Sequence, residues 1–173
     1  MLDFNRFNVI ASITTLFLVF FAVAQWSEPL RASQNDYVKD LRYLFNNKYQ
    51  YRAPDTLFIN QWATWCKPCL RELPELAALA SRAKGRSDGG AAFVTITSQS
   101  EKEAKEMFEN TTASDHFVSF YDSGSLTTAL QAIRNAERSS IPVNVLIIGD
   151  SVVYAGGFTD TEARKKIEKH LGL

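Results

Sequence analysis

The feature that most constrains this chain is a pair of cysteines separated by two residues, Cys66 and Cys69. They are the only two cysteines among its 173 residues. An apolar run over residues 56–62 precedes the pair, and a helix-like stretch over residues 70–84 follows it. A C-x-x-C pair placed between a strand and a helix is typical of a redox-active dithiol.

The start of a helix is a place where a cysteine becomes reactive. Unpaired backbone N–H groups and the positive end of the helix dipole stabilise a thiolate there, and the pKa of such cysteines falls to roughly 3.5–7.5. Lys67 either adds a favourable charge beside Cys66 or is a solvated side chain. Pro68 suits a first helical turn, where its missing N–H costs no hydrogen bond. Cys69 follows about one turn later, within reach of Cys66.

The residues around the pair carry a more specific signal. The block from Trp62 to Pro74 reads Trp-Ala-Thr-Trp-Cys-Lys-Pro-Cys-Leu-Arg-Glu-Leu-Pro. It resembles the TlpA/ResA-type thioredoxins, which are extracytoplasmic thiol-disulfide oxidoreductases often tethered to the bacterial membrane. The resemblance extends over roughly residues 35–171. It implies an α/β thioredoxin fold, with a central mixed sheet flanked by helices and a helix-plus-strand insertion over about residues 98–133.

Hydrophobic periodicity predicts an alternation of strands and helices in agreement with this fold. The expected strands cover residues 56–62, 91–97, 118–121, 143–148 and 152–154. The expected helices cover residues 35–51, 70–84, 101–110 and 125–133, and a last one runs to about residue 171.

Several local features refine these expectations. The first helix should be amphipathic, and its predicted buried face comprises Tyr37, Leu41, Leu44, Phe45 and Lys48. Pro74 should bend the second helix. Ser98 and Ser100 offer caps for the third helix, and residues 159–162 form a capping box that opens the last one.

The first 26 residues are interpreted as a signal peptide or a membrane anchor. Val9 to Ala24 is uncharged and mostly apolar, and it ends in a small-x-small pattern that suits cleavage after Ala24. Residues 7–26 alternatively supply about the 20 positions of a membrane span, with Trp26 at the interface; a buried core helix is a third interpretation. We expect an exported, periplasmic or extracytoplasmic protein with three parts: signal or anchor 1–26, linker 27–34 and thioredoxin-like domain 35–173.

Ile141 and Pro142 directly precede the expected hairpin. The resembling family has a cis-proline at this place, packed against the redox pair, so the resemblance implies a cis bond at Pro142. Ile141 would then present its backbone to a bound substrate chain as a strand-pairing edge. The alternative is an ordinary trans proline that opens an edge strand. Ser140 and Val143 depart from the family pattern, which affects substrate preference rather than fold.

Glu72 and Asn60 bear on proton transfer. Glu72 lies three residues after Cys69, on the same helical face, and the resembling family often has Glu here. It could take the proton from Cys69 during attack on a mixed disulfide, or it could be a solvated residue paired with Arg71 or Lys67. Asn60 stands where many thioredoxins carry a buried Asp, and because an amide cannot accept a proton at neutral pH we expect a structural role.

The remaining aromatic and imidazole side chains receive simpler interpretations. Trp65 is expected to shield Cys66 and to contact partners, whereas Trp62 is expected in the core. His116 and His170 are 54 positions apart and outside the motif, so we expect both to be exposed and incidental.

Composition and spacing exclude several function classes. The chain has 19 Lys+Arg and 19 Asp+Glu residues. It therefore lacks the excess of positive charge that would indicate nucleic-acid binding. Cys66, Cys69, His116 and His170 lack the spacing of a zinc site, and Leu70 stands where covalent haem attachment needs histidine. We therefore expect neither a cofactor nor a metal. A structural disulfide would constrain little, since its loop is tiny; a Cu(I) metallochaperone and a binding module with an idle redox pair stay open.

These observations predict an exported thiol-disulfide oxidoreductase and a monomer. Cys66 attacks a client disulfide through a mixed disulfide, and Cys69 resolves it. The resemblance favours the reducing direction, toward cytochrome c maturation or another dedicated client, with a membrane thiol-disulfide protein as the electron donor. The alternative is a periplasmic disulfide oxidase or isomerase.

Overall fold

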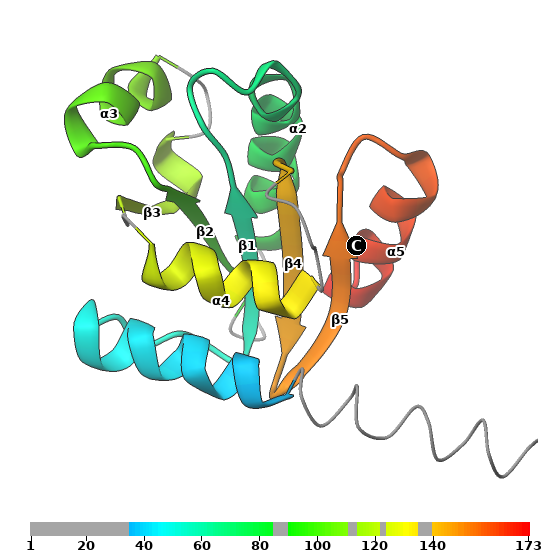
Figure 1. Ribbon diagram of the computed structural model, residues 1–173. Helices are drawn as coiled ribbons and strands as arrows, with labels where there is room; N and C mark the ends of the chain where they lie inside the picture. Colours follow the sequence, from blue (N-terminus) through cyan, green and yellow to red (C-terminus); the bar gives the residue numbers. More distant parts are fainter. Residues whose placement is uncertain (1–34, 85–89, 111–113, 122–123, 135–139) are drawn as a thin grey trace, which may run out of the picture. The chain divides into compact units, whose positions relative to one another are not determined.

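A computed structural model of the protein describes residues 35–84, 90–110, 114–121, 124–134 and 140–173 (Figure 1). The expected signal or anchor segment and linker, residues 1–34, lie outside the described residues. Within the described ranges, no helix has both the length and the apolar character needed to cross a membrane. Asn35–Leu173 form one compact unit.

Five strands form one mixed sheet in the order β3-β2-β1-β4-β5. The central strand β1 (Thr56–Gln61) is parallel to β2 (Ala92–Thr97), which is parallel to β3 (Val118–Tyr121). On the other side, β4 (Val143–Ile148) is antiparallel to β1, and β5 (Ser151–Gly156) is antiparallel to β4. This is the expected mixed sheet, and the predicted fold class is confirmed.

The helices follow the predicted order. The bounds are Lys67–Lys84 for α2, Glu101–Glu109 for α3, Ser125–Arg134 for α4 and Thr161–Leu171 for α5, with a short 3₁₀ turn η2 at Ser114–His116. Residues 35–43 are helical and continue into a π-helical turn η1 (Leu44–Lys48). α2 is continuous through Pro74, and the bend expected there stays a prediction. α3, β3 and α4 make up the insertion between β2 and β4.

The first helix buries only part of the face predicted. Val38, Leu41 and Phe45 are fully buried, whereas Tyr37 and Lys48 are exposed, so the assignment of these last two to the core was wrong. Positions 38, 41 and 45 follow the three-and-four spacing of one helical face. The π-helical turn changes the residues per turn after position 43 and thereby turns residue 48 away from that face.

Capping decides where two helices begin. Ser100 and Glu103 form a reciprocal capping box at α3, as one of the two expected serine caps. At α5 the cap is Asp160, whose carboxylate accepts a hydrogen bond of 3.1 Å from the Glu162 N–H. The predicted capping box beginning at Thr159 was therefore wrong: the cap is the next residue, Asp160, whose carboxylate also interacts favourably with the positive end of the helix dipole.

The alternation of side chains along each strand gives the sheet two different faces. The face under α4 and the first helix, which lie in front in Figure 1, has a mainly apolar core, with buried Gln61 at the end of β1. The face toward α2 and α5 combines Phe58, Phe93 and Leu146 with buried polar residues. The polar positions on that face lie at the end of β1 that leads into α2, and so they lie beneath the cysteines.

Candidate active site

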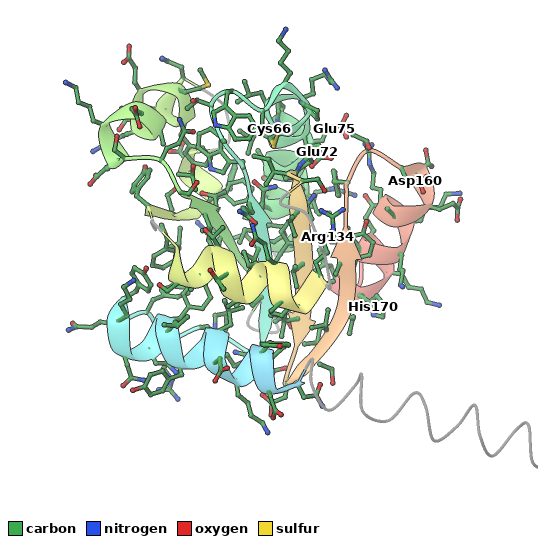
Figure 2. All side chains as sticks on the ribbon, viewed as in Figure 1. Cys66, Glu72, Glu75, Arg134, Asp160 and His170 are labelled. Atoms are coloured by element: carbon green, nitrogen blue, oxygen red, sulfur yellow. A yellow bond between two sulfur atoms is a disulfide. The ribbon has the colours of Figure 1, made fainter. Side chains whose placement is uncertain are left out.

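The cysteine pair lies where the central strand passes into the longest described helix. Cys66 directly precedes α2, and Cys69 is in its first turn (Figure 2). The two sulfurs form a disulfide, with the Cα atoms 5.3 Å apart. Cys66 is 3% exposed and Cys69 is fully buried. The two predicted catalytic cysteines are therefore bonded to each other within a buried apolar cluster, and Cys66 is the more exposed of the two.

Backbone groups at the helix start point at the first sulfur. The Cys69 N–H donates to Cys66 Sγ over 3.2 Å, and the Cys66 carbonyl accepts from the Leu70 N–H over 3.1 Å. In the dithiol form the same N–H faces a sulfur that can be ionised, and a hydrogen bond to the charged form favours that form. The helix N-terminus thus has the geometry that stabilises a thiolate at Cys66.

The peptide bond between Ile141 and Pro142 is cis, as the resemblance implied. Ile141 packs against the apolar cluster that contains both cysteines, so the segment before β4 borders the redox pair. Both residues are half-buried, which leaves part of this segment open to solvent. Substrate contact through the Ile141 backbone stays a prediction.

The two tryptophans beside the motif have opposite environments. Trp62 is 2% exposed and its ring lies 5.4 Å from that of Phe108, which confirms its assignment to the core. Trp65 is 69% exposed, directly before Cys66. Lys67 and Pro68 are also exposed. An exposed apolar side chain next to a reactive sulfur is a surface that a bound protein could cover.

Glu72 is buried, which excludes its interpretation as a solvated side chain. It is 2% exposed, and each oxygen of its carboxylate accepts a hydrogen bond. Asn144 Nδ2 donates to Oε2 over 3.0 Å, and the backbone N–H of Phe158 donates to Oε1 over 3.0 Å. Figure 2 shows Glu72 near the end of α2 that carries Cys66. The carboxylate therefore links α2, β4 and the segment after β5.

Asn60 has the structural role expected of it. It is fully buried, and its Nδ2 donates to Asn144 Oδ1 over 2.8 Å. The two asparagines are directly opposite each other in the antiparallel pairing of β1 and β4. Asn144 itself was missed by sequence reasoning, although it was the one polar residue in the otherwise apolar run 143–148.

Tyr154 on β5 is an ionisable side chain that the Glu72 carboxylate influences. Burial, and then the negative charges of Glu72 and Asp160, raise the pKa of Tyr154 above its ordinary value of 10.0, with Arg134 acting in the opposite direction. Its hydroxyl donates to the Gly157 carbonyl, next to the residue whose N–H binds Glu72. The phenol therefore stays neutral at physiological pH.

The described residues contain no group of three or more His, Cys, Asp or Glu side chains arranged to hold a metal ion. His170 is exposed, as expected, but His116 is half-buried and its Nδ1 is enclosed, so its predicted full exposure was wrong.

Comparison with solved structures identifies the architecture. MTB dsbF, in its mixed oxidised and reduced forms, matches with a TM-score of 0.54 at 15% identity, over 69% of this chain and 82% of that one. A thioredoxin-like protein from Aeropyrum pernix matches with a TM-score of 0.53 at 15% identity, over 68% and 78%. A thio-disulfide isomerase from Thermus thermophilus matches with a TM-score of 0.51 at 17% identity, over 70% and 82%.

The chain has a thioredoxin fold. At these identities the likeness concerns the arrangement of the chain, in which the C-x-x-C pair opens α2 and the cis-proline precedes β4. No protein-family model matches the chain, and no curated protein matches its sequence. The chemistry of this thioredoxin fold must therefore be argued from its own site.

Proposed function

We propose that this protein is a thiol-disulfide oxidoreductase that acts on protein disulfides. One observation carries the proposal: Cys66 Sγ lies at the N-terminus of α2, 3.2 Å from the Cys69 N–H and bonded to Cys69 Sγ. A purely structural disulfide across so short a loop would add little stability. The cis-Pro142 segment beside the pair and the fold shared with a thio-disulfide isomerase support the same chemistry.

The reaction has two exchange steps. The Cys66 thiolate attacks one sulfur of the client disulfide, a Cys66–client disulfide forms, and one client thiolate leaves. Cys69 then loses its proton and attacks Cys66 Sγ, and the second client thiolate leaves. Two electrons pass to the client, whose thiolates take up protons, and the protein is left with the Cys66–Cys69 disulfide.

Glu72 is the proposed acceptor for the Cys69 proton. It lies three residues after Cys69 on the buried face of α2, where helical geometry places the two side chains next to each other. Asn60 cannot accept a proton at neutral pH. Glu72 is therefore the buried carboxylate available for this step, and its burial keeps it apart from the bulk solvent.

We further propose that the protein works as an exported reductant of client disulfides, as a monomer, with a membrane thiol-disulfide protein as its electron donor. The apolar run over residues 9–24 supports export. Exposed Trp65, directly before Cys66, and half-buried Ile141, which packs against the cluster that contains Cys66, form the proposed client-binding surface. Cytochrome c maturation is one setting that this role would fit.

Trapping variants test the assignment. Cys69→Ala should accumulate a mixed disulfide between Cys66 and the client, visible on a non-reducing gel, and Cys66→Ala should not. If the Cys66→Ala protein kept full disulfide reductase activity, the assignment would fail.

The reduction potential of the full chain decides the direction of electron flow. Thiol counting after equilibration in graded redox buffers should give a value near or below about −230 mV for a reductant. A value above about −180 mV would mark an oxidant or isomerase instead, and would place the partners in a disulfide-forming pathway.

A further inference from the structure

Four polar side chains form a row across the sheet beneath the redox pair. Asn144, Asn60, Thr95 and Ser119 occupy paired positions on β4, β1, β2 and β3, and so point to one face. The row consists of two hydrogen-bonded pairs. Thr95 Oγ1 donates to Ser119 Oγ over 3.1 Å, and Asn60 donates to Asn144. The asparagine pair continues in the other direction to Glu72.

The hydrogen bonds between the asparagines fix which end of the Asn144 amide meets the carboxylate. A side-chain amide has one end that donates and one that accepts. Asn60 Nδ2 donates to Asn144 Oδ1, so Asn144 Nδ2 must point away from Asn60, and it reaches Glu72 Oε2. Asn60 does not touch Glu72 in this chain of bonds, but it orients Asn144 so that Asn144 Nδ2 donates to the negative charge.

We propose that Asn144, oriented by Asn60, is a positioning residue that holds the Glu72 carboxylate charged and that reverses its amide when Glu72 takes up a proton. This inference rests on the proposed function, in which the proton comes from the Cys69 thiol. The asparagines transfer no atoms: the thiol proton moves to the carboxylate, and the hydrogen bonds beyond it change direction.

The two carboxylate oxygens are not equivalent in this scheme. Oε1 is bound by the Phe158 backbone N–H, which can only donate. Oε2 is bound by an amide whose other end is an acceptor. A protonated Oε2 can therefore donate to Asn144 Oδ1 once that amide turns over, and so Oε2 is the oxygen that carries the proton.

Asn60 is built to follow this reversal. Its Oδ1 is buried and has no hydrogen-bond partner in the arrangement observed. After both amides turn over, Asn60 Oδ1 accepts from Asn144 Nδ2, so the acceptor left unused in one state is used in the other. A leucine or an aspartate at position 144 could not serve both states, because neither offers both a donor and an acceptor at neutral pH.

Other ionisable groups around the carboxylate belong to the elements packed on it. They are Cys66 and Cys69 at the start of α2 and Tyr154 of β5, on which the charges of Asp160 before α5 and Arg134 at the end of α4 also act. Lys67, Arg71 and Glu75 are on α2 itself and are exposed. The asparagines, unlike these groups, do not titrate, so the orientation of their amides is what changes.

The attack of Cys69 on the mixed disulfide at Cys66 is the step in which Glu72 takes up the proton, so its rate measures the proposed effect of Asn144. The reduced full chain is mixed with oxidised glutathione, and the conversion of the Cys66–glutathione disulfide to the Cys66–Cys69 disulfide is followed by acid quench and mass spectrometry across pH. In Asn144→Leu this step should slow about 10- to 100-fold near neutral pH, the range for losing one hydrogen bond to a charged group. Its acid limb should move to higher pH.

Two matched variants separate positioning from packing. Asn60→Leu should shift the profile in the same direction but less, since the Asn144 amide remains but is no longer oriented. Thr95→Val lies in the same row, without a bond to either asparagine in the described structure, and should leave the profile unchanged. In a Glu72→Gln background, Asn144→Leu should have no further effect on the profile, because the two residues act as one unit.

The native chain provides a measurement that does not depend on any variant folding. Nuclear magnetic resonance should show the side-chain amide signals of Asn144 and Asn60 changing with pH at the same midpoint as the Glu72 carboxyl carbon. An Asn60 signal that ignores this midpoint, or an Asn144→Leu profile that overlays the native one, would overturn the inference. A native chain that does not react with glutathione would instead overturn the proposed function and leave the amide measurement valid.

Discussion

The two faces of the central sheet are made from the same strands and yet are chemically different. Toward α4 and the first helix, β1 presents Leu57 and Ile59, which belong to a large apolar cluster, and only its last residue on this face, Gln61, is polar and buried in the described strand. Toward α2, the next residues along the same strand are Phe58 and Asn60. Because side chains alternate along a strand, a one-residue change of register would exchange the two environments. One face therefore serves stability, and the other places polar groups beneath the cysteines.

The largest effect should come from the tryptophan on the redox face. Trp62→Ala should lower the free energy of unfolding by about 3–5 kcal/mol, because it empties a packed position against Phe108. Trp65→Ala is the matched control: its side chain is exposed, so stability should change by no more than about 0.5 kcal/mol while client reduction slows. Equal destabilisation by both variants in urea unfolding would contradict the assignment of Trp62 to the core.

The apolar face should respond in stability alone. Leu130→Ala removes a fully buried side chain of α4 and should cost about 2–5 kcal/mol. Thr128→Ala, on the exposed side of the same helix, is the control. Activity per folded molecule should be unchanged in both; a shifted pH profile in Leu130→Ala would show that the two faces are not independent.

Val94 and Thr95 are neighbours on β2 and lie on opposite faces of the sheet, so exchanging valine and threonine at these positions compares the two faces. Val94→Thr should cost about 1–3 kcal/mol, because it buries a hydroxyl in the apolar core. Thr95→Val, one residue along and on the other face, removes one hydrogen bond to Ser119 and should cost less than about 1.5 kcal/mol. Thermal unfolding of the two variants measures the difference, and a reversed order would mean that the polar face tolerates substitution less than the apolar one.

The smallest effect concerns two tyrosines. Burial alone raises the pKa of Tyr51, which packs on the apolar face, whereas burial together with the Glu72 and Asp160 charges raises that of Tyr154. A folded phenol with a raised pKa binds its proton more tightly than the unfolded chain does. The associated stability is therefore fully present below about pH 10 and is lost as the pH rises through the folded-state pKa.

Salt distinguishes the two causes of these shifts. Added salt screens charge–charge terms more than burial, so it should lower the titration midpoint of Tyr154 more than that of Tyr51. Phenolate absorbance of the Tyr51→Phe and Tyr154→Phe proteins, each at low and high salt, measures this. Midpoints that move together would mean that the Glu72 charge does not reach Tyr154.

The parts of the site that are adjacent in sequence could be predicted. The C-x-x-C pair at a helix start, the buried Trp62 and the exposed Trp65 lie within the eight residues 62–69, and the local pattern of strand and helix places them. The cis bond at Pro142 was predicted through the family resemblance, not from local chemistry. The buried face of the first helix and the cap of the last one were predicted less well. Val38 is buried where the sequence predicted Tyr37, and Asp160 rather than Thr159 caps α5.

The surroundings of Glu72 could not be predicted from the sequence. Its two partners, Asn144 and the Phe158 N–H, are 72 and 86 positions away along the chain. Whether Glu72 was solvated or buried depended on the side of α2 that meets the sheet, and both alternatives were consistent with its position three residues after Cys69. Asn144 stood out only as a polar residue in an apolar strand.

By itself, the sequence determined the redox pair, the order of strands and helices and the alternation that gives the sheet two faces. These properties arise from neighbours in the chain, through helix-terminus dipoles and side-chain periodicity. Only the tertiary structure decided that Asn60 pairs with Asn144 and that this pair turns a donor toward Glu72. The register between two antiparallel strands sets that contact, and register is fixed when both faces of the sheet are packed at once.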